Sequence, residues 1–208
     1  MLALLEGDMP TALRLMRAAV ASARASGFQM REHIALIANA LAAAHSGEHA
    51  EAQQALNQVF SHPMFAACRW HHWVGGCVAA YAALLRDDDA GVLQHLRAAL
   101  HVARECGYRH GPMLFLCGDM MSRLCAFALL HGVEPDIARD IAVRNQLKAP
   151  PQADGSWPWA VRVRALGALE VEIGGTPMAS SRKESRRLLE LLGVLAAHGH
   201  TPVAQDAI

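Results

Sequence analysis

Apolar residues recur at three- and four-residue spacing through the first 147 residues, which predicts amphipathic helices. Residues 30–45 carry one such apolar face, made of Ile34, Ile37, Ala38 and Leu41. We expect Gly47 to end this helix in the left-handed conformation, and a second helix to occupy 49–60. The same pattern predicts two further helix pairs, over 64–85 with 90–106 and over 112–131 with 135–147.

The turns between these helices recur along the chain. Gly7, Gly47 and Asp87 follow one another at intervals of forty residues, and Gly132 follows after forty-five. One helix pair cannot bury its apolar face alone, so residues 1–147 are expected to stack as an α-α solenoid. A non-repetitive helical bundle is the alternative.

The residues after each turn resemble the tetratricopeptide repeat (TPR), with Gly7, Ala12, Met16 and Ala19 at its characteristic positions in the first unit. The step of forty exceeds the usual thirty-four. In that respect the chain looks like the TPR-like sensor domains of large bacterial transcription regulators. The resemblance implies a groove lined by the first helix of each unit, accepting a peptide, another domain of the same protein or a small effector. The groove candidates are Asn39, Trp70 and Trp73.

The pattern changes after residue 147. Residues 148–156 are rich in proline, glycine and small polar residues and are expected to form a linker. Alternating apolar and charged residues then predict two strands, which place Arg162 and Arg164 opposite Glu170 and Glu172. Gly174-Gly175 predicts a two-residue hairpin turn. Ser181 and Glu184 form a capping box that begins a helix whose apolar stripe is Leu188, Leu191, Leu192 and Leu195.

Residues 157–208 resemble the start of an OmpR/PhoB-type winged-helix DNA-binding domain, most closely that of bacterial transcriptional activators of the antibiotic-regulatory (SARP) kind. The resemblance rests on Trp157-Pro158-Trp159, the two strands, the Gly-Gly turn and the leucine-rich helix. In that family the third helix enters the DNA major groove, and this sequence includes only the sheet, the first helix and the beginning of the second. DNA binding is therefore expected only through a full-length winged helix.

Four basic residues near the start of the last helix are candidates for DNA phosphate contacts: Arg182, Lys183, Arg186 and Arg187. The alternative is a solvated helix face beside Glu184 and Glu190. The chain has 19 basic and 19 acidic residues, so its formal charge is zero and a globally basic DNA-binding protein is excluded. The indication of nucleic-acid binding in this sequence therefore rests on residues 157–208, which resemble the start of a winged helix.

The sequence contains no catalytic motif of the nucleotide-binding, esterase or zinc-protease kind, so we expect no enzyme, no catalytic residues and no cofactor. Cys68 and His72, four residues apart, are too few ligands for a metal site. Five cysteines without a C-x-x-C pair indicate buried reduced thiols, and no signal peptide or membrane span is present. A cytoplasmic protein without membrane contact is expected.

Two further features have structural explanations. Asp87-Asp88-Asp89 is expected to cap the N-terminus of the following helix, and Gly75-Gly76 to allow a neighbouring helix to approach closely.

Together the observations indicate a fragment of a bacterial transcription regulator with a TPR-like interaction domain, 1–147, and a truncated winged helix, 157–208. The alternative is a TPR-like protein-interaction scaffold that does not bind DNA.

Overall fold

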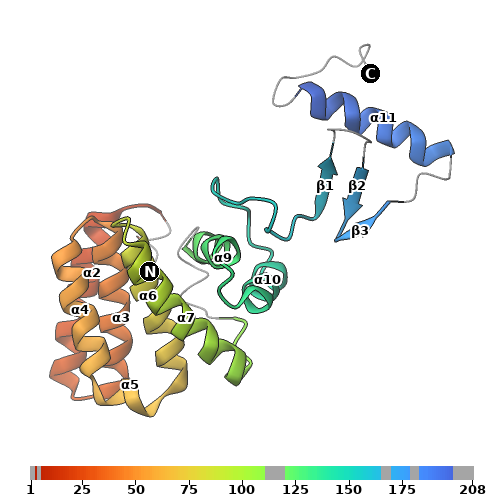
Figure 1. The fold of residues 1–208 in the computed structure, drawn as a ribbon. Helices are drawn as coiled ribbons and strands as arrows, with labels where there is room; N and C mark the ends of the chain where they lie inside the picture. Colours follow the sequence, from red (N-terminus) through yellow and green to blue (C-terminus); the bar gives the residue numbers. More distant parts are fainter. Residues whose placement is uncertain (1–2, 4–5, 111–119, 165–169, 179–182, 199–208) are drawn as a thin grey trace. The chain divides into compact units, whose positions relative to one another are not determined.

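The computed structural model describes residues 3, 6–110, 120–164, 170–178 and 183–198, which belong to two compact units, 1–157 and 158–208 (Figure 1). The first unit is helical, and the second contains a three-stranded antiparallel sheet and one helix. The prediction of a mainly α chain with a small sheet is therefore confirmed. No described helix combines the length and hydrophobicity that a membrane span requires.

The helices of the first unit follow the predicted pairs closely. They are α2 (Met9–Ser26), α3 (Gln29–His45), α4 (His49–Ser61), α5 (Pro63–Ala67), α6 (Arg69–Leu84), α7 (Asp89–Cys106), α9 (Met120–Leu130) and α10 (Pro135–Arg144).

Two of these helices differ from the prediction. The single helix predicted over 64–85 is wrong, because Cys68 adopts an extended conformation (φ −132°, ψ 108°) that separates α5 from α6. The helix predicted over 135–147 ends at Arg144. The first part of the helix predicted over 112–131 lies outside the described residues.

The same backbone turn recurs at the predicted interval before α2, α4, α7 and α10, and it also follows the ends of α7 and α10. In each copy a left-handed residue is followed by an N–H that donates to a carbonyl five residues back, as in a Schellman motif. Before the four helices, the donor and acceptor pairs are Asp8 to Ala3 (2.9 Å), Glu48 to Ala43 (2.9 Å), Asp88 to Ala83 (3.1 Å) and Val133 to Ala128 (2.8 Å). The left-handed residues there are Gly7, Gly47, Asp87 and Gly132. Aspartate is one of the few residues that tolerate this conformation, so Asp87 replaces glycine without changing the turn.

Aspartate side chains begin two of the helices that follow these turns. The Thr11 N–H donates to Asp8 Oδ1 at 3.1 Å, and the Gly91 N–H donates to Asp88 Oδ1 at 2.9 Å. The predicted capping role is thus confirmed for Asp88, while Asp87 forms the turn itself.

The first helices of the pairs form the centre of the first unit. Helix α3 packs against α2, α4 and α6, and α6 packs against α7 and α9. Every residue from Ala35 to Ala44 in α3 and from Trp73 to Ala83 in α6 is buried. Both stretches are rich in alanine, so helices can pack on nearly every side of them at short distances.

Gly76 provides the closest of these contacts. A Cβ atom on Gly76 would lie 2.9 Å from the Ala99 Cβ, and one on Gly75 would lie 3.3 Å from Val59 Cγ1. The prediction that Gly75-Gly76 allows a neighbouring helix to approach closely is confirmed.

The segment 148–156 is not a free linker. Ala149 and Ala153 pack against the helical core, and the Ala153 N–H donates to the Pro150 carbonyl at 2.9 Å in a turn. Trp157 is 4% exposed and belongs to the same core. The predicted linker 148–156 therefore lies against the helical core, and Trp157, predicted to begin the second domain, belongs to this core. The apolar side chains of this segment are buried against the helices, which the composition of the segment did not predict. The two units divide between Trp157 and Pro158.

The second unit consists of β1 (Val161–Arg164), β2 (Glu170–Ile173), β3 (Thr176–Pro177) and α11 (Lys183–His198), with strand order β1-β2-β3. The predicted register is confirmed, since Arg162 pairs with Glu172 and Arg164 with Glu170. The corresponding charged groups lie 3.5 and 3.3 Å apart. Gly174 and Gly175 both have positive φ and form the predicted two-residue turn.

The apolar side of this hairpin is covered only in part. Val171 is buried, whereas the cross-strand neighbours Val161 and Ile173 are 50% and 53% exposed. Leu191 and Leu192 of α11 are half-buried. Ser181 of the predicted capping box lies outside the described residues.

Replacing Gly76 with alanine tests the close approach of α6 and α7. The added methyl group must displace the Ala99 backbone or side chain, and such overpacking costs about 1–3 kcal/mol, against a gain of up to about 1 kcal/mol in helix propensity. We expect urea unfolding to show net destabilisation. Gly155→Ala is the control, because no atom lies within 4 Å of its added Cβ. Equal stabilities of the two variants would contradict the close packing.

Candidate functional site

A surface groove runs between α2 and α4, with α3 beneath it. Its volume is about 180 Å³, and its lining residues are Arg17, Val20, Arg24, Leu36, Asn39, Glu51, Gln54, Ala55 and Gln58. The apolar members lie among guanidinium, carboxylate and carboxamide groups. The groove therefore offers both hydrogen-bond donors and acceptors around an apolar base.

Two contacts bridge the groove from α2 to α4. Arg17 binds the Glu51 carboxylate through both oxygens, with Nε at 2.9 Å from Oε1. Two helical turns further along α2, Arg24 Nη2 donates to Gln58 Oε1 at 2.6 Å. The bond from Arg17 holds the pKa of Glu51 below its usual value, so this carboxylate is charged at neutral pH.

Asn39 lies at the base of the groove and is 7% exposed. Its Nδ2 donates weakly to Glu51 Oε1 at 3.4 Å, while its buried Oδ1 has no hydrogen-bond partner. An unpaired buried acceptor costs about 1–3 kcal/mol. Because this oxygen is itself enclosed, Asn39 belongs to the base of the groove, as predicted, but offers no accessible acceptor to a partner.

The two tryptophan candidates lie elsewhere, on α6. Trp73 is fully buried and stacks on Tyr108 with ring centroids 5.4 Å apart, so its assignment to a partner groove is wrong. Trp70 is half-buried and contacts the ring of His71 edge-on. The structure therefore does not bring Trp70 and Trp73 together with Asn39.

The rim of this groove also differs from the expectation. Helices α2 and α4, the second helices of their pairs, form the rim, and the first helix α3 contributes only Leu36 and Asn39. The physical reason is the burial of α3 and α6 over their alanine-rich stretches, where they have little free face to offer.

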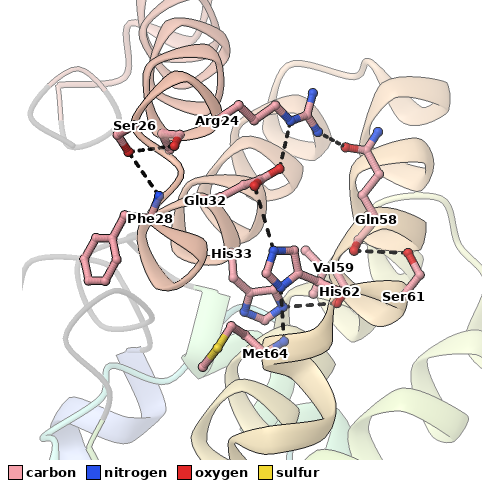
Figure 2. Close-up of polar contacts among 11 residues, drawn as sticks. Arg24, Ser26, Phe28, Glu32, His33, Gln58, Val59, Ser61, His62 and Met64 are labelled. Carbon is pink, nitrogen blue, oxygen red and sulfur yellow. Dashed lines mark hydrogen bonds and ion pairs between the residues drawn. The ribbon is translucent and has the colours of Figure 1, made fainter.

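Three histidines that are distant in sequence meet near one end of this groove. The His33 ring lies 4.9 Å from that of His62 and 4.3 Å from that of His71, centroid to centroid. Figure 2 shows His33 and His62 together with the polar chain that leads to them. His33 and His71 are fully buried.

Arg24 connects the histidines to the groove (Figure 2). Its Nε donates to Glu32 Oε1 at 2.8 Å, and Glu32 Oε2 lies 3.9 Å from His62 Nε2. His62 Nδ1 in turn accepts from the Met64 N–H at 3.1 Å. The same arginine therefore binds Gln58 in the groove and the carboxylate next to the histidines.

His33 is held in its neutral form. Its Nε2 lies 3.0 Å from the Val59 carbonyl oxygen, and its Nδ1 has no partner. Burial, with the neighbouring His71 and His62, lowers the pKa of His33 to about 4. A neutral imidazole in this setting is a packing group that resists protonation.

The described residues contain no group of three or more histidine, cysteine or acidic side chains arranged to hold a metal ion. Cys68 lies in the break between α5 and α6, and the His72 ring stacks on Phe65 at 4.2 Å. The His72 side chain therefore has a packing role.

The DNA-backbone candidates are only partly described. Arg182 lies outside the described residues, and Lys183 and Arg186 are placed in the first turn of α11 by their backbone alone. Arg187, on the same helix, is exposed.

Sequence reasoning missed most of the groove. A signal for it existed, because Glu51, Gln54 and Gln58 form a polar stripe at helical spacing beside the apolar face of α4. The histidine cluster has no comparable signal, since its members are separated by up to 38 positions, from 33 to 71, in a chain with twelve histidines.

Comparisons of the chain with protein-family models, with curated proteins and with solved structures give no match.

The lowered pKa of His33 predicts that the protein loses stability in acid. Between pH 6.5 and about 4 the unfolded chain protonates this histidine and the folded chain does not, so the free energy of unfolding falls as the pH decreases. The full loss amounts to about 3 kcal/mol. In His33→Gln, whose amide can also donate to the Val59 carbonyl, we expect a smaller drop between pH 7.5 and 5 in urea titrations.

His49→Gln provides the control, because His49 is exposed at the start of α4 and should leave the pH dependence unchanged. Identical pH profiles for the wild type and His33→Gln would show that His33 is not the group responsible.

Proposed function

We propose that the chain is part of a bacterial transcription regulator, in which a TPR-like solenoid binds a protein segment and the second unit contributes to DNA contact. The observation that carries this proposal is the recurrence of one backbone turn directly before α2, α4, α7 and α10, at steps of forty, forty and forty-five residues, ahead of a hairpin and helix. A protein-recognition module that is joined to the first part of a winged-helix domain is an arrangement suited to a transcription regulator.

The contacts between successive second helices support a solenoid. Arg17 and Arg24 of α2 reach residues 34 positions later in α4, and Arg104 of α7 reaches Glu134, at the start of α10, at 3.1 Å. In a stacked repeat each unit contacts its neighbours through equivalent surfaces. Polar links between neighbouring second helices at both ends of the array are consistent with such stacking.

The groove between α2 and α4 favours a peptide over an enclosed small molecule. Its volume of about 180 Å³ is below the roughly 300–1,000 Å³ of pockets that enclose drug-sized ligands. An extended peptide needs only part of its surface covered, and its backbone presents alternating donors and acceptors. The exposed carboxamide of Gln54 can pair with both kinds of group.

The second unit supports only backbone contact with DNA. Arg162 and Arg164 are neutralised by Glu172 and Glu170, which leaves Lys183, Arg186 and Arg187 of α11, with Arg182 directly before them in the sequence, as the source of positive charge. Phosphate contacts of this kind position a protein without reading sequence. Sequence-specific recognition would need the later parts of a complete winged helix.

A scaffold without DNA binding is the second candidate. The exposed cross-strand pair Val161 and Ile173, together with the partly exposed Trp159, forms apolar surface that would suit a protein contact. Either function leaves the groove between α2 and α4 with the same role.

DNA association of the chain should be weak, independent of sequence and dependent on salt. At most four phosphate contacts predict a slope of about −3.6 for the logarithm of the binding constant against that of salt concentration. In fluorescence anisotropy with a randomised duplex pool, we expect binding at low salt that disappears near physiological ionic strength. The quadruple variant Arg182→Gln, Lys183→Gln, Arg186→Gln, Arg187→Gln should lose it, while Arg162→Gln with Arg164→Gln should not.

Three outcomes of this experiment decide between the candidates. No binding by the wild type at low salt would favour the scaffold. Binding that the quadruple variant retains, or enrichment of one DNA sequence, would show that the DNA contact surface lies elsewhere on the chain.

The peptide groove is tested with an array of random ten-residue peptides. Gln54→Ala should weaken the peptides that bind by about 3- to 10-fold, the effect of one or two hydrogen bonds. Gln53→Ala is a matched control, since Gln53 is exposed on the same helix and bonds to Asn57 outside the groove. An array that detects no binding, or equal losses in both variants, would contradict the groove assignment.

A further inference from the structure

The packing of α6 against α7 places Cys68 and Cys106 at the same height along the two helix axes. The two helices are joined by the turn at 85–88 and lie closest where Gly76 faces Ala99. Moving away from the turn, Arg69, the first residue of α6, lies seven residues before Gly76, and Cys106 lies seven residues after Ala99; Cys68 directly precedes Arg69. At a rise of about 1.5 Å per residue, both distances along the helix axes are about 11 Å.

Cys106 also lies on the side of α7 that faces α6. The buried residues Val92, Leu96, Ala99 and Ala103 form a stripe at spacings of three and four, and Cys106 is its next member. Cys106 is exposed because it is the last residue of the helix.

Neighbouring side chains connect the same two positions. Arg69, next to Cys68, forms an ion pair with Glu105, next to Cys106. The Tyr108 ring stacks on Trp73, and its hydroxyl shares a hydrogen bond with the Cys106 thiol. Burial and a hydrogen bond with Cys106 raise the pKa of Tyr108, and Cys68 adds to this rise.

The other described cysteines are protected from oxidants. Cys77 and Cys125 are fully buried, and burial raises the pKa of both thiols, that of Cys125 to about 12. Since the thiolate is the reactive form, these two are inert. Cys68 is half-buried and Cys106 exposed, so the sequence-based expectation of uniformly buried thiols is wrong for these positions.

We propose that Cys68 and Cys106 are a redox-active pair that a hydroperoxide converts to a disulfide joining the start of α6 to the end of α7. The Cys106 thiolate attacks one peroxide oxygen, the O–O bond breaks and water or an alcohol leaves, giving a sulfenic acid. The Cys68 thiolate then attacks this sulfur and displaces the oxygen as water. Two thiols and one hydroperoxide thus yield one disulfide, one water and one water or alcohol.

The bond would hold the break between α5 and α6, because Cys68 is the extended residue that separates them. A cross-link also removes conformational freedom from the unfolded chain. We therefore expect the oxidised protein to unfold at a higher temperature than the reduced protein, and dithiothreitol to reverse the change. This inference does not depend on the proposed function.

The experiment treats the full chain with hydrogen peroxide, blocks the remaining thiols with iodoacetamide and maps peptides by mass spectrometry without reduction. We expect a cross-linked pair containing Cys68 and Cys106, the loss of two of the five thiols and their recovery with dithiothreitol. Cys68→Ser and Cys106→Ser should each abolish the cross-link, and Cys117→Ser should retain it.

Circular dichroism establishes that each variant is folded. A disulfide that includes Cys117, Cys77 or Cys125 in the wild type would overturn the proposal. So would a folded chain in which Cys106 is oxidised to sulfinic acid, or stays reduced, without a bond to Cys68.

Discussion

The close packing of helix backbones around α3 and α6 is the constraint on which the first unit depends. Both helices are buried on nearly every side, and their alanines, with Gly75 and Gly76 in α6, let the neighbouring helices approach closely. Gly76 extends the principle, because any larger residue would collide with Ala99. The other helices are arranged around these two, and their outer faces carry the polar groups.

The groove and the histidine cluster are both consequences of this arrangement. With α3 buried, α2 and α4 form the accessible surface, and their facing polar side chains meet across it. Beyond Arg24 the interior becomes closed, and there His33 stays neutral against the Val59 carbonyl. One arginine thus lies at the border between a solvent-facing polar surface and a buried cluster.

The local features of the fold could be predicted from sequence because they depend on neighbouring residues. Gly47 and Gly174-Gly175 require positive φ, and the alternation of Arg162 and Arg164 with valines determines the strand register. The helix break at Cys68 was not predictable from periodicity, which continues across it. The burial of Trp157 depends on a surface formed by distant helices, so the composition of 148–156 suggested a linker instead.

The candidate site was less predictable for the same reason. Asn39 was identified as a groove residue, but a tryptophan on an apolar helix has equal reason to be buried, as Trp73 is. Arg17 and Glu51 are 34 residues apart, and their contact depends on how α2 and α4 pack on α3.

Native-state hydrogen exchange measured residue by residue tests the central role of α3 and α6 most directly. Amides that open only when the whole unit unfolds exchange at the rate set by global stability. The packing predicts this slowest class in Leu36–Ala44 and Val74–Ala83, with faster exchange on the outer turns of α2 and α4. Exchange in α3 as fast as in α2 would contradict the claim that the unit is built around these helices.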